Sequence, residues 1–321
     1  MARRTLGKPG VVALLALVTC VAGPTRATQE VIGDEPPHAN AAVYPLLDDL
    51  KSGDATVRTG AVMAMRELGP VAWPAVPVLI EALSDPFVGV RKGAAGALGG
   101  IGPAAEDAVP ALIQALTDPH RFVRSWAAMA LFEIGPAAKP AAANLIHMMQ
   151  NDAQNLRGRA WCASALAKLG ADPDLAVPAL AGALANDDSE EVRSVAVLSL
   201  EKYGLEAARR GATHSLSDAL SDPHWKVRGN AACALPEMGA DAEMALSQLA
   251  GALRDDAPYV RGCAAQALGK LGPLALDVAH EIEPLLEDED DHVRGRAEQA
   301  LQRLREQKPP ASDKGLGAAA L

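Results

Sequence analysis

The side chains that could act as acids, bases or metal ligands are few and scattered along this chain of 321 residues. The seven histidines are His38, His120, His147, His214, His224, His280 and His292. They do not cluster, whereas a metal centre needs several ligands in one place. The acidic run 287–291 lacks the alternating ligands and the glycine of an EF-hand loop. We therefore predict no catalytic residue, no metal and no cofactor, and interpret these side chains as solvated turn residues.

One charged residue does have a regular spacing, and it reveals the elements of the fold. An arginine recurs every 33 to 35 residues: Arg58, Arg91, Arg124, Arg159, Arg193, Arg228, Arg261 and Arg294. Three residues later stands a small residue: Ala61, Ala94, Ala127, Cys162, Ala196, Ala231, Ala264 or Ala297. Large apolar residues occur seven and ten residues after each arginine, for example Leu98 and Ile101. These offsets fall on one face of a helix, so the pattern predicts a helix with a buried stripe in every repeat.

Glycine marks the end of this helix, eleven residues after the arginine, in seven repeats: Gly69, Gly102, Gly135, Gly170, Gly204, Gly239 and Gly272. We expect these glycines in the left-handed conformation just past the last turn, and the proline that follows four of them to prevent continuation of the helix. Arg305 takes this place in the last repeat, within the polar stretch 302–307, which is typical of a terminal cap.

A first helix precedes each arginine, as in 108–116 and 177–184, with a proline in its first turn. The turn between the two helices carries an aspartate six residues before the arginine: Asp85, Asp118, Asp187, Asp222, Asp255 and Asp288. Ser52 takes this place in the first repeat, and the fourth repeat has Asn151-Asp152 in a longer turn. The sequence therefore predicts eight two-helix repeats over residues 39–307 and an all-α fold.

The pattern resembles HEAT repeats, especially the short variety named after phycobilin-lyase subunits, and residues 85–103 follow that consensus almost throughout. The resemblance implies a right-handed α-solenoid whose second helices line the concave face. It also implies that aspartate and arginine form a ladder between neighbouring repeats, which gives a structural role to Asp85, Arg91, Asp118, Arg124, Arg159, Asp187, Arg193, Asp222, Arg228, Asp255, Arg261, Asp288 and Arg294. Some HEAT-like enzymes use several His-Glu pairs for a di-iron site, but this chain has only His280-Glu281.

Two tryptophans depart from the repeat pattern. Trp126 and Trp161 stand two residues after the arginine in adjacent repeats, where the fold requires no large aromatic residue. With Met129 and Phe132 they form a candidate partner-binding patch, in which adjacent layers would set the two indoles side by side. The alternative is partial burial between repeats, because the tryptophan positions fall near the edge of the buried stripe.

The N-terminus has the features of a targeting segment. Arg3, Arg4 and Lys8 precede an apolar run over 11–22 that is too short to span a membrane, and Ala27 ends a site suited to signal peptidase. We therefore expect a signal peptide over 1–27 and a periplasmic or extracellular protein. A lipid anchor at Cys20 is the alternative. Disordered segments are expected over 28–38 and 308–321.

Cleavage would leave three cysteines, Cys162, Cys233 and Cys263. Cys233 and Cys263 stand at different helical offsets in successive repeats, so no disulfide is assumed and buried or partly buried free thiols are expected. Cleavage would also leave 26 basic against 40 acidic side chains, a net charge of −14. Such a balance disfavours nucleic acid as a partner.

The sequence thus favours an exported, non-enzymatic scaffold that binds a protein or an extended peptide along its concave face. The alternative is an enzyme or enzyme subunit of the HEAT-like lyase or hydroxylase type. Bound iron or pigment would distinguish the two.

Overall fold

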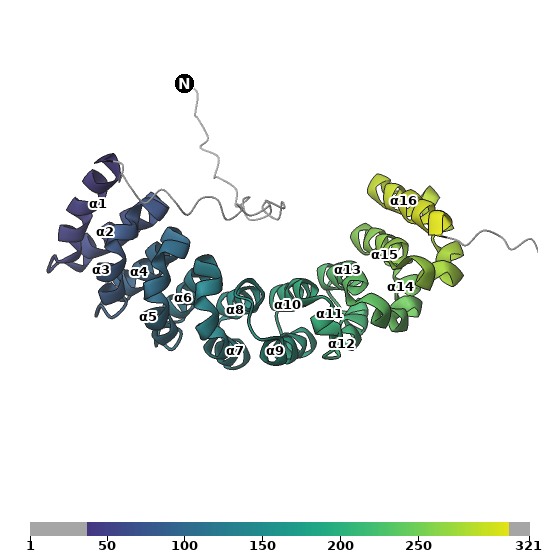
Figure 1. Cartoon of the computed structure of the whole chain (residues 1–321), viewed down its shortest axis with the longest axis horizontal. Helices are drawn as coiled ribbons and strands as arrows, with labels where there is room; N and C mark the ends of the chain where they lie inside the picture. Colours follow the sequence, from purple (N-terminus) through teal and green to yellow (C-terminus); the bar gives the residue numbers. More distant parts are fainter. Residues whose placement is uncertain (1–36, 308–321) are drawn as a thin grey trace, which may run out of the picture.

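The computed structural model describes residues 37–307, and this part of the chain is helical without any strand. The helices stack in chain order into an open arc, with α1 (Pro37–Leu50) at one end and α16 (Asp291–Gln307) at the other (Figure 1). This is the predicted α-solenoid. The predicted signal peptide and tail, and residues 28–36 of the predicted linker, lie outside the described residues.

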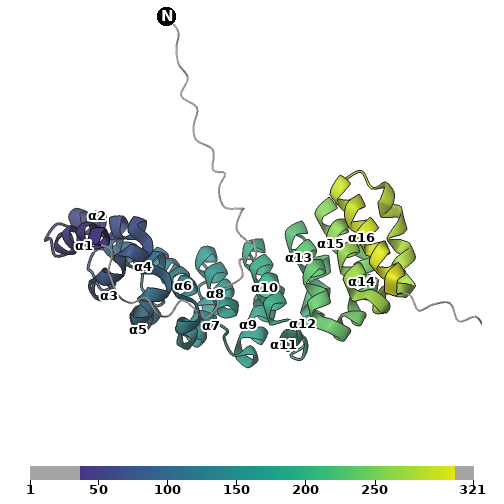
Figure 2. The same ribbon diagram turned by 45° about the horizontal axis from the view of Figure 1, so that its top comes forward.

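The helices that contain the periodic arginines lie side by side along the hollow of the arc, and we call them the inner helices (Figures 1 and 2). They are α2 (Ala55–Leu68), α4 (Val88–Ile101), α6 (Arg121–Ile134), α8 (Leu156–Lys168), α10 (Glu190–Tyr203), α13 (Trp225–Ala234), α15 (Pro258–Leu271) and α16. Successive inner helices pack directly against one another, so together they form the concave face.

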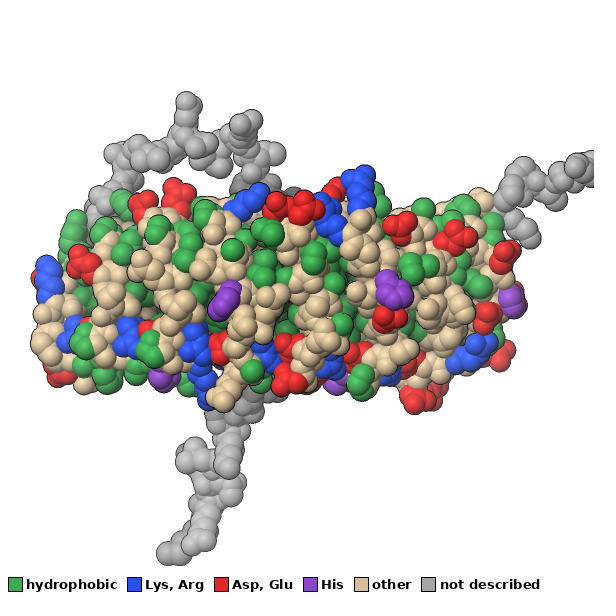
Figure 3. All heavy atoms as spheres, turned by 90° about the horizontal axis from the view of Figure 1, so that it is seen from below, with side chains coloured by type: hydrophobic (Ala, Val, Ile, Leu, Met, Phe, Trp, Pro, Cys, Tyr) green, Lys and Arg blue, Asp and Glu red, His purple; other side chains and the backbone are tan. Residues whose placement is uncertain are grey.

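The outer helices form the convex side of the arc (Figure 1). They are α3 (Val76–Ala82), α5 (Val109–Ala115), α7 (Ala142–Asn151), α9 (Pro173–Asn186), α11 (Leu205–Ala208), α12 (Ala212–Asp218) and α14 (Leu246–Ala252). Short 3-10 helices adjoin them: η1 (Gly69–Ala75), η2 (Gly102–Ala108), η3 (Gly135–Ala141), η4 (Ala219–Ser221), η5 (Leu235–Ala245), η6 (Gly272–Glu281) and η7 (Glu283–Glu287). Seen from below, uncharged side chains cover the middle of this convex side, and acidic and basic side chains gather mainly along its edges (Figure 3).

The core is a continuous layer of small and aliphatic side chains between the two rows of helices. The row of small residues predicted to face inward, from Ala61 to Ala297, is buried throughout. Because these side chains are short, neighbouring inner helices approach closely: a methyl group at Gly269 of α15 would lie 2.6 Å from the Cα atom of Ala300 in α16. Close packing of small residues thus replaces the aromatic centres that the composition lacks.

The glycines that end the inner helices have positive φ angles, as at Gly135, where φ is 80°. The ψ angle of Gly135 is −142°, so this residue is not in the left-handed helical conformation that the sequence suggested. The backbone enters instead a region that is almost restricted to glycine, and it turns directly into the 3-10 helix η3. The glycine row therefore sets the angle between each inner helix and the next outer segment.

Candidate functional site

A ladder of ion pairs runs along the turns between outer and inner helices. Arg91 illustrates it: Nε donates to Oδ2 of Asp118 at 2.7 Å and Nη2 donates to Oδ1 at 3.2 Å, while Nη1 donates to the carbonyl oxygen of Asp85 at 2.9 Å. Each arginine thus binds the carboxylate of the following repeat and the backbone of its own turn. The same arrangement occurs in Arg58–Asp85, Arg159–Asp187, Arg193–Asp222, Arg228–Asp255 and Arg261–Asp288.

The ladder carboxylates are largely buried and fully engaged. The side chain of Asp118 is 8% exposed, and its Oδ1 also accepts the backbone N–H of His120 at 2.7 Å, just before α6 begins. Burial acts to raise the pKa of Asp118, but hydrogen bonds from Arg91 and His120 outweigh it and hold the pKa below its ordinary value. The Asp118 hydrogen bonds raise the pKa of Arg91 in turn. Both partners of such a pair are held by contacts within the protein, and these contacts join one repeat to the next.

The ladder departs from the predicted residues at two places. Arg124 pairs with Asp152, at 2.6 Å between Nε and Oδ2, which stands seven rather than six residues before Arg159 because the turn is longer. At the end of the array Arg294 pairs with Asp291 of its own helix and donates to the carbonyl oxygen of Asp288. The sequence placed Asn151-Asp152 in this longer turn but did not assign Asp152 to the ladder.

The longer turn is fixed by Asn155, which precedes α8 and is 4% exposed. Its Oδ1 accepts hydrogen bonds from the hydroxyl of Ser125 at 2.7 Å and from the N–H of Gly158 at 3.1 Å, and its Nδ2 donates to the carbonyl oxygen of Arg121 at 3.1 Å. Asn155 therefore caps α8 and binds it to α6. Sequence reasoning missed this residue, although the unusual length of the turn was its signal.

The four residues predicted as a partner-binding patch lie on two adjacent inner helices, α6 and α8, and we call them the aromatic cluster (Trp126, Met129, Phe132 and Trp161). All four are partly exposed. The rings of Phe132 and Trp161 lie 5.3 Å apart at an angle of 55°. The ammonium group of Lys168 lies 3.9 Å from the Phe132 ring centre and forms an ion pair with Glu133.

Trp126 extends in the opposite direction, across α4. A methyl group at Gly96 would lie 3.2 Å from the Trp126 ring and also 3.2 Å from Cδ of Arg66. The guanidinium of Arg66, on α2, lies 4.9 Å from the centre of that ring. Gly99 gives the same kind of space to Met129, whose Cε lies 3.2 Å from the position of a methyl group there. Because Gly96 and Gly99 have no side chain, Trp126 and Met129 pack directly against the backbone of α4.

The two indoles lie on adjacent inner helices, but each makes its close contacts with other residues. Within the described residues, the close ring neighbour of Trp161 is Phe132, and Trp126 instead faces Arg66 and Gly96. The contacts between adjacent inner helices join non-equivalent positions: Trp126, two residues after its arginine, faces Gly96, five residues after the arginine of the preceding repeat. Together with Arg66 on α2, the aromatic cluster on α6 and α8 therefore forms an elongated strip along the concave face.

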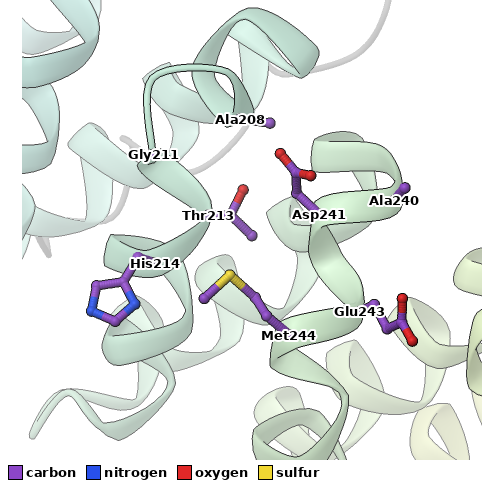
Figure 4. A pocket seen from close by; sticks show the side chains of 8 residues that line it. All are labelled: Ala208, Gly211, Thr213, His214, Ala240, Asp241, Glu243 and Met244. Atoms are coloured by element: carbon purple, nitrogen blue, oxygen red, sulfur yellow. The ribbon is translucent and has the colours of Figure 1, made fainter.

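A shallow cavity of about 470 Å³ lies elsewhere, between α12 and η5 (Figure 4). His214, Asp241 and Glu243 line it, but their side chains point in different directions, so they form no acid-base pair. The hydroxyl of Thr213 is buried beside it without a protein partner. Over residues 37–307 no three side chains of the His, Cys, Asp and Glu types come together in a way that could hold a metal ion. This cavity therefore offers no catalytic arrangement.

No helix in the described part of the chain has the length and apolar character needed to cross a bilayer. The HEAT repeat family matches the sequence over residues 40–132, 76–167 and 213–308. No curated protein sequence matches it significantly.

Solved structures show the same architecture. An engineered protein is 24% identical, with a TM-score of 0.59 over 82% of this chain and 78% of its own. The Escherichia coli protein YibA is 20% identical, with a TM-score of 0.58 over 84% of this chain and 95% of its own. The complex of CpcE and CpcF of phycocyanin lyase from Nostoc sp. PCC7120 is 20% identical, with a TM-score of 0.46 over 89% of this chain and 99% of its own. The first two likenesses establish a common fold.

Proposed function

Because this chain belongs to the HEAT repeat family, we propose that it is an exported scaffold without enzymatic activity that binds a protein or an extended peptide along its concave face. The observation that carries this proposal is the aromatic cluster on α6 and α8. Large side chains sit there on the concave face at positions where other repeats have small ones, such as Gly60 and Gly93. Partly exposed tryptophans are the side chains most enriched at the centres of protein interfaces.

The surroundings of the aromatic cluster favour a linear segment as the partner. Arg66 and Lys168 lie at its two ends, each over an aromatic ring. A strip of rings with a cation at each end fits an extended chain that carries apolar side chains and acidic ones in alternation. The strip does not enclose a bound side chain, so the affinity for a peptide would come from several consecutive peptide side chains that each contact it.

Nucleic acid fits this surface poorly. The arginines with regular spacing are neutralised by the ladder aspartates, and the predicted exported chain has a net charge of −14. Outside the ladder, acidic side chains outnumber the basic ones, so this surface would repel a phosphate backbone. This supports a protein partner over a nucleic-acid partner.

Binding is tested by removing the two inner-face tryptophans together, as Trp126→Ala/Trp161→Ala. Linear peptides selected from a random display library on the full chain provide the probe, and calorimetry measures their affinity. We expect the double variant to lose about tenfold or more in affinity, because buried aromatic anchors dominate such interfaces. Trp73→Ala/Trp225→Ala is the matched control, since Trp73 and Trp225 are exposed but lie outside the aromatic cluster.

The control should keep its affinity to within about twofold. Equal affinities of the two double variants would refute the aromatic cluster as the binding site. Circular dichroism of both variants distinguishes lost binding from lost folding.

Export is tested separately by fractionating cells that express the full gene and determining the N-terminal residue of the recovered protein. Cleavage after Ala27 and recovery outside the cytoplasm are expected. Recovery of an acylated Cys20 would establish the lipid anchor instead, and an intact N-terminus in the cytoplasm would contradict export.

A further inference from the structure

The edge of the solenoid that holds the Arg–Asp ladder also carries exposed apolar and basic side chains where α4, α6 and α8 begin. These three are successive inner helices that pack directly on one another. Three large apolar side chains on this edge are each between 46% and 48% exposed, and three basic side chains near them are exposed as well. We call these six residues the basic edge: Phe87, Lys92, Arg121, Phe122, Leu156 and Arg157.

The basic edge contains no acidic residue to balance its cations. Six basic residues and no acidic one occur over 86–92, 119–124 and 153–159. Three of the six are ladder arginines, whose charge is balanced by the aspartates of the following repeats. The other three, Lys92, Arg121 and Arg157, take part in none of the ion pairs of residues 37–307. This edge is therefore locally positive, although the whole chain is negative.

The same edge is acidic in the second half of the array. Its equivalent segments are 188–193, 223–228, 256–261 and 289–294. They contain seven acidic residues and, apart from the ladder arginines, a single Lys or Arg residue, Lys226. Charge is thus segregated along the edge, and an anionic surface would be attracted to the second, third and fourth repeats only.

Contacts within the protein hold the apolar side chains of the basic edge in place. Oδ1 of Asp85 accepts the N–H of Phe87 at 2.7 Å. The Phe87 ring folds back over the start of α4, where a methyl group at Gly89 would lie 2.8 Å from its Cε1 atom. The guanidinium of Arg121 lies 5.0 Å from the centre of the Phe122 ring. Because these side chains are ordered beforehand, their burial against a partner costs less conformational entropy.

We infer that the basic edge docks on the surface of a bilayer that contains anionic lipids. Exposed Phe and Leu side chains insert between lipid headgroups, and cations beside them attract the lipid phosphates. The three segments have the same place in successive repeats, so one flat surface contacts all of them together. The inference does not depend on the binding proposed for the concave face.

Other partners fit this edge less well. Three unpaired cations displace few counterions from a nucleic acid, and Leu156 provides no ring on which a base can stack. A folded protein would need hollows that match the exposed side chains, whereas the headgroup region of a bilayer adapts to them.

The test uses residues 28–321, which keep every described helix and the continuous core but omit the apolar run 11–22, because that run would insert into lipid by itself. Sedimentation with phosphatidylcholine vesicles is compared with sedimentation with vesicles that also contain about one third phosphatidylglycerol. We expect binding to the anionic vesicles only, weakened by salt, with inorganic phosphate competing no better than chloride at equal ionic strength. Equal binding to both vesicles, no binding to either, specific competition by phosphate, or retention on single-stranded DNA alone would overturn the inference.

Neutralising the three cations tests the charge of the basic edge. Lys92→Gln/Arg121→Gln/Arg157→Gln should weaken binding to the anionic vesicles by about a hundredfold, because each cation near such a surface adds to the attraction. Circular dichroism of the variant separates lost binding from lost folding.

The matched control is Lys202→Gln/Lys226→Gln/Arg303→Gln, which removes the same charge from exposed positions outside the basic edge. Its binding should stay within about twofold of that of the unchanged protein. Equal losses in the two triple variants would show that net charge alone governs binding, and the docking surface would then be wrong.

The apolar contribution is tested by Phe87→Ser/Phe122→Ser, which should weaken vesicle binding by about tenfold or more, since two rings no longer enter the headgroup region. Trp73→Ser/Met244→Ser removes two large side chains that are exposed outside the basic edge and should leave binding unchanged. If the two double variants bound the vesicles equally well, the two rings would not enter the bilayer.

Discussion

Glycines at the ends of the inner helices determine the direction in which the chain turns. At Gly135 the energetic effect of the backbone conformation can be measured without a contribution from side-chain contacts. Its φ angle is 80°, and a methyl group there would have no neighbour within 4 Å. We expect Gly135→Ala to lower the free energy of unfolding by about 1 to 2 kcal/mol through backbone strain only. Urea denaturation followed by circular dichroism measures the change.

Gly182 is the matched control, because it also has no neighbour within 4 Å but lies in the interior of α9. Gly182→Ala should raise the free energy of unfolding by up to about 1 kcal/mol, since alanine favours the helix. Changes of the same sign in the two variants would show that φ does not control the response at Gly135.

Between elements, the Arg–Asp ladder joins each inner helix to the turn of the following repeat. We expect Arg91→Met to lower the free energy of unfolding by about 2 kcal/mol, because Asp118 then remains largely buried without its cation. Lys92→Met, an exposed change at the adjacent position, should stay within about 0.5 kcal/mol of the natural protein. A loss at Lys92 as large as that at Arg91 would contradict the ladder as the cause.

The elements were predictable to different degrees. The offsets of small and apolar residues from each arginine contain the full helical period, so the inner helices and their buried faces follow from the sequence. The contacts of Trp126 with Arg66 and with the backbone at Gly96 depend on how far one helix is displaced along the next. That displacement results from packing of the whole layer, and no single repeat contains it.

For the whole molecule, the ladder makes stability depend on pH in a defined direction. Hydrogen bonds from Arg58 and Arg261 hold the pKa values of Asp85 and Asp288 below the ordinary value of 3.8. Their stabilisation is therefore complete above that value and is lost as pH falls through the lowered pKa of the folded state. Helicity measured between pH 5 and pH 2 should show cooperative loss below about pH 4.

Asp85→Asn should reduce the dependence of the unfolding free energy on pH in this acid range, because one linked proton is removed. Asp107→Asn, at an exposed position of η2, should leave the dependence unchanged. If the unfolding free energy of Asp85→Asn depended on pH as strongly as that of the natural protein, protonation of other groups would be the cause of acid unfolding.

The ladder also bears on how such a chain can change in length. Each arginine binds forward to the next carboxylate and holds its own turn through a backbone carbonyl, so every junction uses the same two groups. Deletion of residues 86–118 would join Asp85 to Pro119. Arg58 would still pair with Asp85, and Arg124 would donate to the carbonyl oxygen of Asp85 instead of that of Asp118. Deletion or duplication of one repeat in the gene would therefore preserve every remaining Arg–Asp junction. The length of the concave face can change in this way during evolution while the core packing of each repeat stays the same.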